Sequence, residues 1–178
     1  LGSRTNTPQT RDLIRRLNLA AITVLNNKGN ILPLHSDKET PPMALLEVGD
    51  AGETDVLAKQ LEKHTSLVRF RLRKEMTEAQ GKVLRDSLSK YRRVIVAVAE
   101  QRLAPFQPFF AALAADKKAA PAIYVFFTPG KMMLQIHRAV SAAQSVVLAH
   151  SAGHDVQQQV ADVLFARASA DGRLSASL

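Results

Sequence analysis

The stretch VIVAVA, Val94 to Ala99, carries the strongest β-strand signal in the sequence. Every residue in it is apolar, so it lacks the alternation of a strand with one wet face. A continuous apolar run of this length is typical of the centre of a parallel sheet that helices cover on both faces. We therefore expect this segment to be a central strand.

Short apolar runs alternate with helical patterns on both sides of this segment. Strands are predicted at Ala21 to Leu25, Met43 to Val48, Leu67 to Leu72, Ala122 to Phe127 and Ser145 to Ala149. Helices are predicted at Thr54 to His64, Thr77 to Leu88, Pro105 to Ala115, Met132 to Val140 and Asp155 to Arg167, with Val83, Leu84 and Leu88 facing inward. This order predicts an α/β fold: a three-layer sandwich whose mainly parallel sheet of five or six strands has helices on both faces.

The composition fits one globular domain of 178 residues. The chain has no cysteine, which excludes disulfides, thiol nucleophiles and cysteine-based zinc sites. No apolar run approaches the roughly 20 residues that a membrane-spanning helix needs, so no span is expected.

The net charge of +8 raises the question of an anionic partner. Arg69, Arg71 and Arg73 lie two residues apart, so in a strand they would share one face. The chain has no tryptophan and only two tyrosines, and therefore offers no evident platform for stacking bases. The pattern favours a solvated basic face over a nucleic-acid site.

Three segments carry a family resemblance when taken in order. The first is Ala20 to Asn27 followed by Ile31-Leu32-Pro33-Leu34, and the second is Met43 to Ala51. The third runs from Gly153 through the helix ending Ala161-Asp162-Val163-Leu164-Phe165 to Asp171-Gly172-Arg173-Leu174. This ordered set resembles the C-terminal α/β sandwich domain of glycoside hydrolase family 3, in which "A-D-V-L-F-G" and "P-S-G-R-L-P" follow one another.

The resemblance implies an accessory role. Residues 1–19 would form a linker and leading helix, and residues 20–178 the α/β domain. The domain would pack on a catalytic barrel that carries the nucleophilic aspartate and is absent from this chain. It would be inactive by itself, would need no cofactor, and would meet the carbohydrate substrate only as part of the whole enzyme. The family also implies a bacterial periplasmic or extracellular location.

The loop after Ala99 departs from one branch of the family. In β-glucosidases this position resembles "E-G-E-G-x-D-R" in a long loop, and their second domain supplies the acid/base glutamate. Here the chain runs through Glu100 to Pro105 straight into a helix. The short loop is closer to the β-N-acetylglucosaminidase branch, in which a histidine–aspartate pair on the barrel does the acid/base work. No catalytic residue is therefore expected in this chain.

Glu100, Gln101 and Arg102 are the candidate substrate-binding residues. They follow the central strand, and ligands of open α/β sheets bind outside the carboxyl ends of the strands. Glycosidases need two facing carboxyl groups, about 5–5.5 Å apart for retention or about 6.5–9.5 Å for inversion, and no such pair is evident. The competing interpretation of Glu100 and Arg102 is a surface ion pair or a helix cap.

Two other patterns resemble binding sites. His150, His154 and Asp155 could hold zinc if they shared a helix, but Gly153 is expected to interrupt it, and no metal site is predicted. The turn Gly49-Asp50-Ala51-Gly52 could offer amides to a phosphate, yet it lacks the dinucleotide and P-loop patterns. A tight turn between strand and helix is the preferred explanation.

Two functions remain open at this point. One is the accessory sugar-hydrolase module, and the other is a free-standing α/β domain that binds a phosphorylated or nucleic-acid ligand. A module that docks on a barrel should expose an apolar patch. Phe106, Phe109 and Phe110 lie in a helix that is apolar on nearly every side, so they either form that patch or enter the domain's own core.

Overall fold

The structure is a computed structural model, and it describes residues 22–36 and 42–165. The linker and leading helix expected over residues 1–19 lie outside the described residues. The tail with Asp171 to Leu174 also lies outside them. The division into these two parts therefore stays a prediction.

The described residues form one six-stranded sheet in the order β1-β6-β5-β4-β2-β3. Its strands are β1 (Thr23–Asn27), β2 (Met43–Val48), β3 (Leu67–Leu72), β4 (Val94–Val98), β5 (Ala122–Phe126) and β6 (Ser145–Leu148). Strands β2 to β6 pair in parallel, and only β1 runs antiparallel, along β6. The predicted mainly parallel sheet is thus confirmed.

The segment VIVAVA does lie inside the sheet. Strand β4 pairs with β2 on one side and β5 on the other, so that Val96 lies between Leu46 and Tyr124. All five residues of β4 are buried. Its apolar character on both faces reflects cover from both helical layers.

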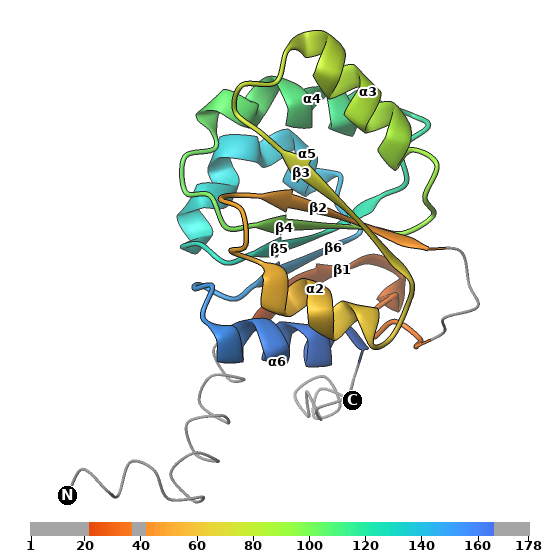
Figure 1. The fold of residues 1–178 in the computed structure, drawn as a ribbon, viewed down its shortest axis with the longest axis vertical. Helices are drawn as coiled ribbons and strands as arrows, with labels where there is room; N and C mark the ends of the chain where they lie inside the picture. The colour runs from red at the N-terminus through yellow and green to blue at the C-terminus, as the bar shows by residue number, and fades with distance from the viewer. Residues whose placement is uncertain (1–21, 37–41, 166–178) are drawn as a thin grey trace, which may run out of the picture.

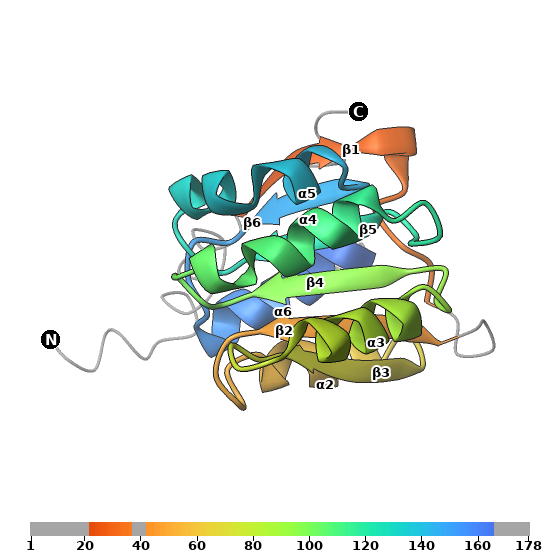
Figure 2. The same cartoon turned by 90° about the horizontal axis from the view of Figure 1, so that it is seen from above.

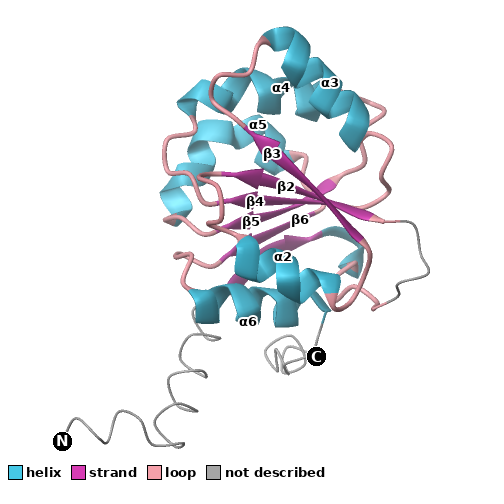
Figure 3. Cartoon of the chain, viewed as in Figure 1, coloured by secondary structure: helices cyan, strands magenta, loops and turns pink. Residues whose placement is uncertain are grey.

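Helices cover both faces of the sheet (Figures 1 and 2). One layer holds α3 (Glu78–Leu88), α4 (Gln107–Ala115) and the short α5 (His137–Ser141), and the other holds α2 (Asp55–Glu62) and α6 (His154–Phe165). Figure 3 shows the sheet between these two layers. None of the helices in the described part of the chain has the length and apolar character to cross a membrane.

Each face of the sheet has its own apolar core, because successive strand residues point to opposite faces. Ala44, Leu46 and Val48 of β2 pack under the α3–α4–α5 layer. Met43 and Leu45 of the same strand pack on the α2–α6 layer. Glu47 continues this second set, and its carboxylate is therefore buried beside α2.

The three phenylalanines belong to the first core. Phe106, Phe109 and Phe110 are 3%, 7% and 1% exposed. The ring of Phe110 lies edge-on to Phe109 at 5.5 Å and near Tyr124 of β5 at 6.1 Å. Of the two alternatives, entry into the domain's own core is therefore the correct one: the short 3₁₀ helix η3 (Ala104–Phe106) and α4 place all three rings in the core on this face of the sheet.

Two helical expectations also need correction. Val83 was expected to face inward but is 65% exposed, since the inward positions of α3 are Gly81, Leu84 and Leu88. The helix predicted over Met132 to Val140 is instead the 3₁₀ helix η4 (Gly130–Ile136) followed by α5. The non-helical backbone of Ile136, with φ −127° and ψ 43°, separates the two.

The strand order creates a switch point between β2 and β4. From β2 the chain crosses to β3 on one side through α2, and then returns past β2 to β4 through α3. The loops that leave β2 and β4 therefore diverge to opposite faces. In open α/β sheets a crevice forms at this place, outside the carboxyl ends of the strands.

Candidate functional site

A cleft of about 310 Å³ lies at the carboxyl ends of β2, β3 and β4. Three loops and one buried ring contribute its lining, which consists of Gly49, Asp50, Ala51, Arg71, Leu72, Arg73, Lys74, Glu75, Glu100 and Phe106. Three cationic and three carboxylate side chains are among these residues. Of the predicted residues, Glu100 reaches this cleft.

Glu100 is an acceptor in two interactions. Its Oε2 accepts the backbone N–H of Arg102 at 3.1 Å, and its Oε1 lies 3.4 Å from Nζ of Lys74. The hydrogen bond from Arg102, supported by the charge of Lys74, lowers the pKa of Glu100 below its usual value. The carboxylate is thus ionised and 18% exposed, and it closes the turn that leads to α4. Glu100 thus forms its ion pair with Lys74 rather than with Arg102, and it is not a helix cap, because the 3₁₀ helix that follows, η3 (Ala104–Phe106), has no side-chain cap bond.

Gln101 and Arg102 lie on the surface beside Glu100. The side chain of Gln135 in η4 fixes their backbone: its Oε1 accepts from Leu103 N at 2.9 Å and its Nε2 donates to the Gln101 carbonyl at 3.3 Å. Sequence reasoning missed Gln135, whose only signal was a lone polar residue within an apolar stretch. The loop is therefore braced, with the Arg102 side chain exposed to solvent.

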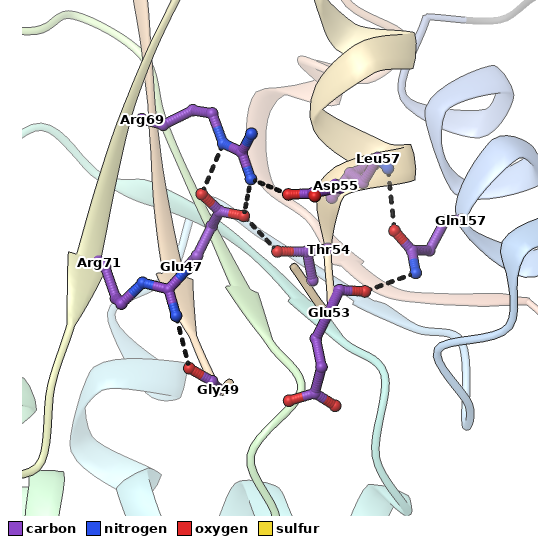
Figure 4. Close-up of polar contacts among 9 residues, drawn as sticks. All are labelled: Glu47, Gly49, Glu53, Thr54, Asp55, Leu57, Arg69, Arg71 and Gln157. Atoms are coloured by element: carbon purple, nitrogen blue, oxygen red, sulfur yellow. Dashed lines mark hydrogen bonds and ion pairs between the residues drawn. The ribbon is translucent and has the colours of Figure 1, made fainter. Parts of the chain in front are cut away.

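A network of carboxylates surrounds Arg69, next to the start of α2 (Figure 4). Arg69 of β3 binds Glu47 through two hydrogen bonds of 2.8 and 2.7 Å, and Thr54 donates its hydroxyl to the same carboxylate at 2.5 Å. Arg69 also lies 2.6 Å from Asp55. The hydrogen bond from Arg69 lowers the pKa of Asp55, and the bond to Glu47 raises the pKa of Arg69. This network ties β2, β3 and α2 together, so Arg69 does not contribute to a free basic face.

The Gly49–Gly52 turn is stabilised from within. Gly49 has φ +150°, and a Cβ there would lie 2.8 Å from Oε1 of Glu53 and 3.2 Å from Cβ of Ala99. The N–H of Asp50 donates to Oε1 of Glu53 at 2.8 Å. Figure 4 shows Gln157 of α6 bonded to Leu57 N at 2.9 Å and to the Glu53 carbonyl at 2.8 Å. The amides of Glu53 and Asp55 also donate back to the Asp50 and Gly52 carbonyls, so these internal bonds favour the tight-turn interpretation.

His150 and His154 do not share a helix. His150 lies in a turn with φ +67°, and α6 begins at His154, next to the Gly153 that was expected to interrupt the helix. Within residues 22–36 and 42–165, no group of three or more histidine, aspartate or glutamate side chains could hold a metal ion.

No protein-family model matches the chain, and no curated protein matches it in sequence. Solved structures do match in fold. A fungal multi-domain β-N-acetylglucosaminidase of glycoside hydrolase family 3, described as having a GCN5-related glucosamine N-acetyltransferase region, matches with a TM-score of 0.74 and 16% identity over 94% of this chain. A β-glucosidase from Listeria innocua gives 0.67 and 14% over 92%, and a family 3 β-N-acetylglucosaminidase from Paenibacillus gives 0.64 and 18% over 90%.

The chain spans 19%, 26% and 31% of these three enzymes. At such identities the likeness shows a shared fold. The fold that the ordered segments predicted, that of an α/β region in glycoside hydrolase family 3 enzymes, is confirmed.

Proposed function

We propose that this chain is an accessory α/β domain of a family 3 glycoside hydrolase of the β-N-acetylglucosaminidase type, which packs on a catalytic barrel and lacks activity by itself. The observation that carries the proposal is the fold match: at least 90% of the chain aligns with a part, 19–31%, of such enzymes. A domain that forms a minor part of larger hydrolases is expected to work beside their catalytic part.

The chemistry of the described residues supports an accessory role. Glu47 is bonded to Arg69 and Thr54, and Glu100 accepts from Arg102 N and faces Lys74. A general acid in a glycosidase needs a raised pKa, whereas the pKa of Glu100 is lowered. Both carboxylates therefore suit structural roles better than proton transfer.

Within this proposal, the loop Glu100-Gln101-Arg102 forms one wall of the carbohydrate site. Glu100 is held in place, and Gln135 braces the backbone that follows it. The exposed Arg102 side chain can then donate to sugar hydroxyl or carbonyl oxygens without first breaking an ion pair. Such a contact acts on binding rather than on the chemical step.

The test starts by reading the coding sequence upstream of Leu1 and expressing the longer polypeptide. A barrel-length stretch supports the accessory domain, and a start codon close to Leu1 contradicts it. In the longer polypeptide, Arg102→Ala should raise KM for a chromogenic N-acetylglucosaminide about tenfold with kcat nearly unchanged, as expected for one lost charged hydrogen bond.

Arg92→Ala is the matched control for that test. Arg92 is also exposed. It comes before β4 and Arg102 comes after it, so the two arginines lie at opposite ends of this strand. KM should stay unchanged in Arg92→Ala. Equal KM values for both variants would contradict the role of the Glu100–Arg102 loop, while the accessory role would still depend on the upstream sequence.

A further inference from the structure

A second hollow, a groove of about 420 Å³, runs between α3 and α4. It shares Leu72, Arg73, Lys74 and Phe106 with the cleft beside Glu100 but extends over the helical layer. Its remaining lining residues are Met76, Thr77, Glu78, Gly81, Arg85, Pro105, Pro108, Phe109 and Ala112. Figure 2 shows α3 and α4 side by side over β4 and β2.

The charge of this groove is one-sided. Arg73, Lys74 and Arg85 line it, and Glu78 is its only lining carboxylate. Lys74 is shared with Glu100, but the guanidinium groups of Arg73 and Arg85 form no ion pair with any described residue. The N-terminal ends of α3 and α4 border the same groove and add positive potential.

One of these arginines is already positioned. The guanidinium carbon of Arg85 lies 5.6 Å from the centre of the Phe109 ring. Stacking on a ring limits the motion of a guanidinium but leaves its N–H edge open to a carboxylate. Pro105, Pro108 and Met76 provide apolar surface next to this charge.

Gly81 keeps the groove open. A Cβ at this position would lie 3.6 Å from Cδ1 of Phe109 and 3.5 Å from Nη1 of Arg85, both at ordinary contact distance. A longer side chain at position 81 would therefore have to extend into the groove. Glycine inside a helix lowers its stability, so a variant with a longer side chain at position 81 should still fold.

We propose that the α3–α4 groove binds an acidic peptide segment of a partner polypeptide, with carboxylates on Arg73 and Arg85 and an apolar side chain against Pro105, Pro108 and Met76. Recognition of acidic motifs by clustered arginines is a recurrent mode of peptide binding. The site does not depend on the carbohydrate role proposed above.

The segments before residue 22 and after residue 165 are basic rather than acidic. Residues 1–21 carry four arginines and one aspartate, and residues 166–178 carry two arginines and one aspartate. A second copy would bring another net charge of +8. Charge complementarity therefore favours an acidic partner segment over these two segments or a second copy.

The experiment selects displayed random 12-residue peptides on the immobilised full chain and measures the best peptide by calorimetry. Selected peptides should be rich in aspartate and glutamate around phenylalanine, leucine or methionine. The double variant Arg73→Ala/Arg85→Ala and the groove-filling Gly81→Gln should each weaken binding at least tenfold. Arg92→Ala/Arg138→Ala, which removes the same charge elsewhere on the surface, should leave it within twofold.

Three results would overturn the proposal. Selected peptides could lack acidic residues, or the acidic peptide could bind the groove variants as tightly as the unaltered chain. A 12-base-pair DNA duplex could also bind more tightly than the peptide and with the same dependence on Arg73 and Arg85, which would make the groove a nucleic-acid site. Circular dichroism of each variant excludes unfolding as the cause of lost binding.

Discussion

Glu100 ionises more readily than a free glutamate because Arg102 N–H donates to it and Lys74 faces it. A carboxylate whose folded pKa is lowered stabilises the fold above its unfolded pKa, and this contribution disappears as the pH falls through the folded pKa. Glu100→Gln should therefore lower the free energy of unfolding at pH 7. The difference from the unaltered chain should shrink as the pH falls below the ordinary value of 4.5.

Urea unfolding of both proteins at pH 7, 5 and 3 measures this difference. A difference that is the same at pH 7 and pH 3 would show that the ionised form of Glu100 contributes nothing.

Two glycines should respond to alanine in opposite directions. Gly81 lies within α3, where an added methyl group meets only ordinary contacts, so Gly81→Ala should stabilise the protein by about 0.5–1 kcal/mol. Gly52 has φ +87°, which alanine adopts only with strain, so Gly52→Ala should destabilise it by about 1 kcal/mol or more. Denaturant midpoints of the two variants check this, and a loss of stability in Gly81→Ala would mean that α3 and α4 pack more tightly than described.

The start of helix α2 is stabilised by a side chain from α6. Its N-cap residue Thr54 gives its hydroxyl to Glu47 and makes no cap bond. The buried amide of Gln157 instead accepts from Leu57 N and donates to the Glu53 and Ala152 carbonyls. Gln157 thus fastens the start of α2, the loop before it and the start of α6 together.

Gln157→Ala should cost about 2–3 kcal/mol of stability, because it leaves buried backbone groups without partners. Gln158→Ala is the control: its side chain is exposed, and its loss should change stability by less than about 0.5 kcal/mol. Amide hydrogen exchange should also become faster in the first turn of α2 in Gln157→Ala alone. Equal stability of the two variants would contradict the capping role.

The elements that sequence predicted well are those with local signals. The apolar run Val94–Val98 indicated cover on both faces, and the helix predicted from Thr77 begins there with a capping box between Thr77 and Gln80. The strand expected at Ala21 to Leu25 lies at Thr23–Asn27, because its end is set by pairing with β6. Contacts between residues far apart in the chain had no local sequence signal: Gln157 and Leu57 are 100 positions apart, and Gln135 lies 32 positions from Leu103.

The same distinction applies to the candidate site. Position after a central strand was enough to place Glu100 in a cleft at the sheet edge. Composition could not tell whether Phe106, Phe109 and Phe110 faced a partner or the core, because an apolar helix satisfies both. In the structure these rings share one core with Tyr124 and Phe126 of β5.

For the whole molecule, burial of the phenylalanines removes the apolar patch as a reason to expect docking. The large apolar side chains that remain exposed among the described residues, Leu25, Val83 and Leu134, lie on three separate elements. The two surfaces to which we assign binding are instead polar: the cleft beside Glu100 and the basic groove between α3 and α4. The cleft lies where the strand order opens the sheet edge, and the groove adjoins it but extends over the helical layer.

We propose that this chain serves a glycoside hydrolase without hydrolysing sugars by itself. The most direct measurement is turnover of a chromogenic β-N-acetylglucosaminide and a chromogenic β-glucoside by the pure 178-residue chain. We predict no release of chromophore above the buffer blank, because the carboxylates of Glu47 and Glu100 are bonded to their neighbours and Glu100 has a lowered pKa. Turnover of either substrate that disappears on Glu100→Gln would contradict the claim.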